Sequence, residues 1–117
     1  MDVSYKGRPY MPPKWVYFLL VLVAFELIAD VLAKQFALSG KLALGALALL
    51  GFVAANVAWL ASLRSGAELS RGAILFSVLS SIGAVIIGVV IFQEKATPLK
   101  LIGLALGVVS VALLAAD

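Results

Sequence analysis

Four long apolar segments, separated by short stretches that carry most of the charges, make up most of this chain. The segments cover residues 15–33, 42–63, 72–92 and 101–116. Each holds about 16 to 22 residues, which is enough to cross a hydrocarbon core of about 30 Å as a helix. We therefore predict an all-α integral membrane protein with four transmembrane helices, at about 14–36, 41–63, 69–92 and 97–116.

The polar stretches define the limits of this helical domain. Residues 1–13, MDVSYKGRPYMPP, are polar and contain three prolines, so we interpret them as an arm that precedes a domain over residues 14–117. Thr97 followed by Pro98 predicts the start of the fourth helix. A threonine hydroxyl can cap the free amides of the first turn, and proline has no amide hydrogen that needs a partner there.

The composition restricts the chemistry that this chain can perform. Hydrophobic residues make up 64% of it, and it contains neither cysteine nor histidine. Disulfides, thiolate chemistry and histidine-ligated metals are therefore excluded. No nucleophile–base set or metal cluster is visible in the sequence, so we expect neither an enzyme nor a cofactor. The nine Lys and Arg residues are spread singly, which is typical of the edges of membrane spans and not of a nucleic-acid surface.

The positive charges are almost evenly divided between the two sides of the membrane. One side would carry Lys6, Arg8, Lys14, Arg64 and Arg71. The other would carry Lys34, Lys41, Lys95 and Lys100. Orientation follows the excess of Lys and Arg on the cytoplasmic side, and a division of five to four provides almost none. The chain is therefore expected to insert in both orientations.

Two carboxylates interrupt the first apolar segment, in the stretch FELIADVLAK. Glu26 lies twelve residues after Lys14 and eight before Lys34, and Asp30 follows one helical turn later on the same face. An apolar environment disfavours the charged form of a carboxyl group, and a like charge nearby disfavours it further. We expect at least one of the two to hold a proton near neutral pH, and a bound cation to expel it. Asp30 has an alternative interpretation, in which it pairs with Lys34 or reaches the interface.

Other residues predict a polar pocket between the helices. In the second segment Phe52, Asn56 and Trp59 share a face; Asn56 can hydrogen-bond between helices, and Trp59 can offer an aromatic face to a cation or belong to an interfacial belt. In the third segment the expected lining residues are Phe76, Ser77 and Ser80, although a stripe of small residues there also suits close helix packing.

The fourth segment carries a candidate surface for pairing with a second copy. Gly103 and Gly107 form a G-x-x-x-G pattern, and Ser110 lies near the same face. Small residues at this spacing let two helix backbones approach closely. We predict a dimer interface on these three residues.

The pattern after residue 14 resembles the small multidrug resistance family, within the drug/metabolite transporter superfamily. The most specific part is a glutamate in the middle of the first helix and a lysine eight residues later, here Glu26 and Lys34. The segment FQEKATP is similar to an F-G-E-x-x-T stretch that is widespread in the superfamily. The segment GLALGVVSV resembles the family's dimerisation stretch of Gly, six residues, then Gly-Val, with Ser110 in place of the second glycine.

This resemblance implies a proton-coupled antiporter in the inner membrane of a bacterium or archaeon. The protein would work as an antiparallel homodimer that exports cations such as quaternary ammonium or guanidinium compounds by alternating access. The glutamate that matches Glu26 would bind both proton and substrate. No partner is implied beyond a second copy, the lipid bilayer, the cation and the proton.

The sequence also departs from the family in its third helix. A Gly-x-Ala-Tyr-Ala-x-Trp segment is usual there, whereas this chain reads SRGAILFSVLSS with Phe76 as its sole aromatic residue. Asp30 replaces a residue that is usually small or hydroxylated. The architecture and Glu26 therefore carry over, but the substrate class does not. The chain equally resembles a single unit of the larger EamA-like metabolite exporters.

Three alternatives to a cation antiporter remain open. The chain could be an EamA-like transporter unit for a small metabolite or a lipid carrier, a small dual-topology channel, or a membrane assembly partner that transports nothing. The acidic pair argues against an anion channel. The absence of Lys and Arg from the middle of the spans argues against a phosphate-bearing lipid as cargo.

Overall fold

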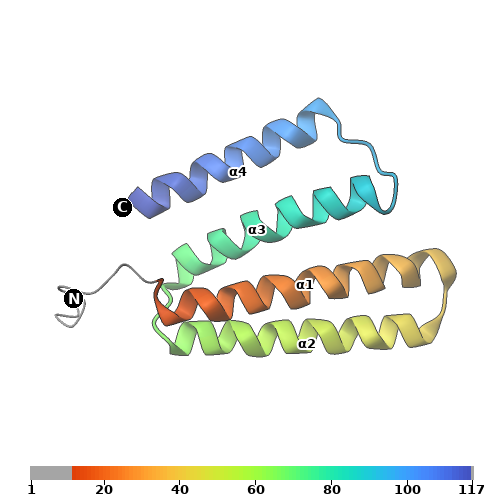
Figure 1. Ribbon diagram of the computed structural model, residues 1–117, viewed down its shortest axis with the longest axis horizontal. Helices are drawn as coiled ribbons and strands as arrows, with labels where there is room; N and C mark the ends of the chain where they lie inside the picture. Colours follow the sequence, from red (N-terminus) through yellow and green to blue (C-terminus); the bar gives the residue numbers. More distant parts are fainter. Residues whose placement is uncertain (1–11, 117) are drawn as a thin grey trace.

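The computed structural model describes residues 12–116 and contains four helices, which are labelled in Figure 1. They are α1 (Lys14–Ser39), α2 (Leu42–Arg64), α3 (Leu69–Val90) and α4 (Pro98–Ala116). Each is long and apolar enough to cross a membrane, as expected for a four-helix membrane protein. Most of the predicted N-terminal arm, residues 1–11, lies outside the described residues.

Helix ends differ from the prediction where backbone geometry decides them. α1 continues to Ser39 instead of stopping near residue 36, because the residues after Lys34 still favour a helix. It ends at Gly40, whose φ of 72° is left-handed and whose amide donates to the carbonyl of Phe36 at 2.7 Å. α3 ends at Val90, two residues before the predicted 92, and Gln93 adopts a positive φ of 60° just beyond it.

The predicted start of the fourth helix is confirmed. α4 begins at Pro98, and the Lys100 amide donates to the hydroxyl oxygen of Thr97 at 3.3 Å. The hydroxyl therefore satisfies one of the free amides in the first turn, as the Thr-Pro pair predicted.

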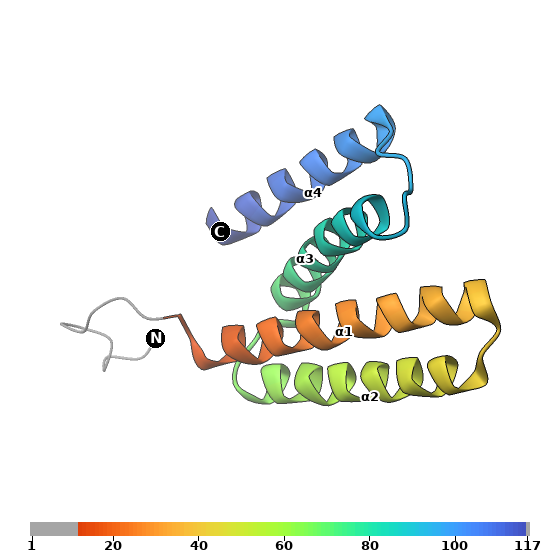
Figure 2. The same ribbon diagram turned by 45° about the vertical axis from the view of Figure 1, so that its right-hand side comes forward.

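The four helices form an open array in the order α2, α1, α3, α4. α1 packs along α2 and also contacts α3, while α4 contacts α3 (Figures 1 and 2). Consecutive helices alternate in direction (Figure 1), which places the described members of the two groups of positive charges at opposite ends of the array. Lys14, Arg64 and Arg71 lie at one end. At the other end Lys41 and Lys95 lie in the α1–α2 and α3–α4 loops, and Lys34 and Lys100 lie in the adjoining parts of α1 and α4.

Small residues let α1 and α2 pack closely. A Cβ placed on Gly51 would lie 2.9 Å from the Cβ of Ala29, so the two backbones meet where a larger residue has no room. The buried core nearby comprises Leu19, Leu22, Ala55 and Ala58. At the end of this pair the buried Ser62 hydroxyl donates to the carbonyl of Trp15 at 3.0 Å. This contact fixes α1 and α2 in register.

The other two helices, α3 and α4, are attached more loosely. α3 approaches α1 at Gly83, where a Cβ would lie 2.6 Å from the Cδ1 of Leu27. α4 approaches α3 at Gly107, where a Cβ would lie 3.3 Å from Cγ2 of Val78. No described residue of α4 is buried. Most of the surface of α4 is therefore free to meet lipid or another protein.

Candidate functional site

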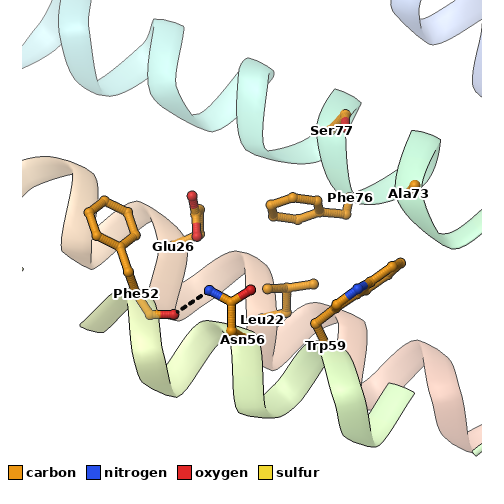
Figure 3. A pocket seen from close by; sticks show the side chains of 8 residues that line it. All are labelled: Leu22, Glu26, Phe52, Asn56, Trp59, Ala73, Phe76 and Ser77. Atoms are coloured by element: carbon orange, nitrogen blue, oxygen red, sulfur yellow. Dashed lines mark hydrogen bonds between the residues drawn. The ribbon is translucent and has the colours of Figure 1, made fainter. Parts of the chain in front are cut away.

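Glu26 lies in the middle of α1 and lines a cavity of about 420 Å³ between α1, α2 and α3. At 1.5 Å per residue it is about 18 Å from Lys14 and about 20 Å from Ser39, so it is far from both ends of the helix. The residues that line the cavity are Leu22, Glu26, Phe52, Asn56, Trp59, Ala73, Phe76 and Ser77 (Figure 3). Three helices thus contribute to one cavity, which extends from the middle of α1 toward the end where α2 is followed by α3.

Two aromatic side chains form facing parts of its wall. Trp59 of α2 and Phe76 of α3 have ring centroids 6.4 Å apart and planes inclined by 37°. The Phe76 ring extends from α3 toward the space beside Glu26 (Figure 3). Gly72 leaves room for the indole, since a Cβ there would lie 3.3 Å from Cη2 of Trp59. The position of Trp59 inside the cavity is compatible with the predicted contact to a cation.

Asn56 and Ser77 supply neutral polar groups to the same cavity. The Asn56 amide donates to the carbonyl of Phe52 at 2.8 Å, which uses one of its two N–H groups and holds the side chain in place. Ser80, which the sequence analysis also placed in the pocket, is absent from the described residues that line this cavity. Its hydroxyl donates to the carbonyl of Phe76 at 2.9 Å.

The cavity has an acidic character because Glu26 is the sole ionisable group among its described lining residues. A carboxylate removed from bulk water needs a counter-charge, a proton or strong hydrogen bonds. No Lys or Arg from residues 12–116 lines the cavity to supply that charge. The site is therefore suited to a proton or a cation, and its aromatic wall suits an organic cation.

Asp30 lines a different, smaller cavity of about 180 Å³ between α1, the end of α3 and the loop that follows it. Lys34, which the sequence offered as a partner for Asp30, lies 3.6 Å from Glu94 Oε2, measured from its Nζ. Both Lys34 and Glu94 line the Asp30 cavity. Glu26 and Asp30 thus lie in different surroundings. The Glu26 cavity has aromatic walls, whereas the Asp30 cavity contains both acidic and basic side chains.

The three residues predicted for the dimer interface do not share one environment. Gly107 lies against Val78 of α3 in the same chain, whereas a Cβ on Gly103 would meet no atom within 4 Å. Ser110 is exposed, and its hydroxyl donates to the carbonyl of Leu106 at 3.1 Å. Gly103 and Ser110 thus remain available to a second copy, and Gly107 already serves contact within the chain.

Sequence reasoning missed several residues of these sites. Leu22 and Ala73 line the Glu26 cavity, and helical spacing could have indicated them, since Leu22 precedes Glu26 by one turn and Ala73 precedes Ser77 by one turn. The Lys34–Glu94 contact joins residues far apart along the chain, so no local pattern could have indicated it.

Comparison with models of known families, with curated proteins and with solved structures finds no match to this chain. The geometry of the site and the motifs of the sequence are therefore what indicates the function of this chain.

Proposed function

We infer that this protein is a proton-coupled antiporter that exports small organic cations, with Glu26 as the group that binds proton and cation in turn. One observation carries this proposal: a carboxylate in the middle of a membrane-spanning helix lines a cavity with Trp59, Phe76 and Asn56, and no described basic residue lines it. Intramembrane ionisable groups of this kind usually serve transport.

Coupling follows from the chemistry of a single carboxylate. A proton and a cation each neutralise the Glu26 carboxylate. Protonation removes the negative charge that attracts the cation, so the two compete for the site. Cation binding therefore releases a proton, and low pH opposes cation binding. If the site faces only one side of the membrane at a time, this competition converts a proton gradient into cation export.

The open side of the cavity favours an antiparallel homodimer as the working unit. Asn56 and Ser77 line the cavity but are exposed in the single chain, so one protomer does not enclose a ligand on its own. The five-to-four division of positive charge suits insertion in both orientations. Two copies of opposite orientation would then bring two Glu26 carboxylates to one cavity near the membrane centre.

Electrical recording of the purified protein in liposomes tests this proposal. Solid-supported-membrane currents are measured on adding tetraphenylphosphonium, guanidinium, a polyamine, and neutral and anionic metabolites in turn. The proposal predicts currents with one or more cations that grow with a proton gradient and vanish in Glu26→Gln. Currents with neutral or anionic metabolites alone would reject it in favour of the EamA-like alternative. A current carried by one ion without exchange would favour a channel.

A further inference from the structure

A separate cavity of about 320 Å³ lies at the end of the array where α1 begins and α4 ends. Trp15 contributes from α1, Arg71 and Leu75 from α3, and Val111 and Leu114 from α4. It shares no lining residue with the Glu26 cavity. Apart from Arg71, the described residues that line it are apolar or aromatic. This cavity plays no part in the antiport proposed above.

Arg71 brings a guanidinium group to this cavity, and one of its donors has no acceptor among the described residues. Its Nε is buried and has no hydrogen-bond partner among the described residues. A guanidinium group carries five N–H donors and stays charged under all ordinary conditions. Leaving a buried donor of a charged group without an acceptor is costly. An anionic oxygen in the cavity would give the Arg71 guanidinium an acceptor of opposite charge, and phosphate suits the planar fork of an arginine.

The rest of the cavity is suited to hydrocarbon at the level of the membrane surface. Arg71 is the third residue of α3 and Trp15 the second of α1, so both lie within the first turn of a membrane-spanning helix. Arginine and tryptophan are typical of this level, where headgroups meet acyl chains. Leu75, Val111 and Leu114 continue the cavity with apolar surface. One cationic group beside an apolar wall matches a phospholipid, whose phosphate and acyl chains are joined through glycerol.

We propose that this cavity binds an anionic phospholipid, with the lipid phosphate on the Arg71 guanidinium and an acyl chain along Leu75, Val111 and Leu114. The surroundings favour a negative headgroup, because Lys14 and Arg64 lie at the same end of the array. The lipid would also have a mechanical role. α4 packs mainly on α3, and an acyl chain in this cavity would link the last turns of α4 to the start of α1.

Native mass spectrometry of the full chain, released from detergent after addition of defined lipids, tests the proposal. The probes are phosphatidylglycerol, phosphatidylcholine and inorganic phosphate. The expected result is retention of phosphatidylglycerol by the wild type, in preference to phosphatidylcholine. Arg71→Gln should weaken that retention about tenfold, which corresponds to about 1.4 kcal/mol. Arg64→Gln is the matched control, because this exposed arginine lies at the same end outside the cavity, and it should retain the lipid as the wild type does.

A second variant keeps the charge and fills the space. Val111→Trp should exclude the acyl chain and reduce lipid retention while Arg71 stays in place, so the test does not depend on the folding of Arg71→Gln alone. Equal retention of both lipids, or unchanged retention in both variants, overturns the proposal. Displacement of the lipid by an equal concentration of inorganic phosphate reduces the site to an anion site and also overturns it. A loss of dimer in lipid-free Arg71→Gln, with lipid adducts unchanged, would assign the cavity to a second copy.

Discussion

Lys34, near the end of α1, lies 3.6 Å from Glu94 in the loop between α3 and α4. The Glu94 side chain also covers Gly88, where a Cβ would come 2.6 Å from Oε1. The Glu94 amide donates to the carbonyl of Gly88 at 2.9 Å. A backbone hydrogen bond therefore attaches the loop to the end of α3, and an ion pair attaches it to α1. Both residues of the ion pair line the cavity that contains Asp30.

Loss of this ion pair should loosen the loop with little effect on stability. The two side chains are 44% and 45% exposed, and exposed pairs contribute about 0–1 kcal/mol. Glu94→Gln should lower the free energy of unfolding by less than about 1 kcal/mol and speed hydrogen exchange in residues 93–97. Lys95→Gln, which leaves the pair intact, should exchange like the wild type. Unchanged exchange in Glu94→Gln would show that the pair does not hold the loop.

Trp59 should contribute to cation affinity through its ring face. A cation against an indole gains about 0.5–2 kcal/mol, so Trp59→Leu should weaken tetraphenylphosphonium binding by about 2- to 30-fold. Trp15→Phe is the matched control, because Trp15 lines a different cavity. Calorimetric titration of both variants checks this prediction. Equal affinity in Trp59→Leu and the wild type would leave Trp59 as a packing residue only.

Gly103 should test the dimer interface more clearly than Gly107. A leucine at position 103 meets no atom of its own chain within 4 Å of its Cβ, whereas a leucine at 107 would press on Val78. Gly103→Leu should therefore reduce the crosslinked dimer in detergent and leave the protomer folded. Gly107→Leu should reduce both the crosslinked dimer and the stability of the folded protomer. If Gly103→Leu dimerises like the wild type, the interface lies on another helix face.

Insertion in both orientations should respond to a small change in charge. The present balance is five positive residues to four, and short loops obey the positive-inside rule. Two added lysines in the loop between α1 and α2 should bias the protein to one orientation, which reporters fused to the C-terminus would detect. A wild-type chain whose C-terminus is found on one side only would remove this support for an antiparallel dimer.

The sequence was sufficient to predict the helices and the position of Glu26 near the middle of α1, because the length and hydrophobicity of the segments decide both. It was less informative about the rotation of each helix about its own axis. α1 and α2 are apolar around most of their circumference, so only a few polar side chains, such as Glu26 and Asn56, indicated which side of each helix faces the cavity. Asn56 and Trp59 were placed together correctly by their spacing on one helix. Asp30 lines a separate cavity because, one turn beyond Glu26 along α1, the facing residues come from the end of α3 and the loop after it.

Contacts between distant segments had no local signal. Lys34 and Glu94 meet because α1 and the α3–α4 loop reach the same end of the array. The sequence analysis placed Arg71 at the edge of a span, but its cavity exists because the last turns of α4 lie near the first turns of α1 and α3. Such sites depend on how helices assemble, and a single sequence carries no direct record of that.

Proton release on cation binding tests the role of Glu26 most directly. Tetraphenylphosphonium or guanidinium is added to purified protein in weak buffer containing a pH dye, and the released protons are counted against bound cation. The wild type should release protons, and its cation affinity should fall as the pH is lowered. Glu26→Gln has nearly the same shape and no titratable group there, so it should release none, while Asp30→Asn should still release protons. Undiminished release from Glu26→Gln, with loss of release in Asp30→Asn, would contradict the assignment and move the shared site to Asp30.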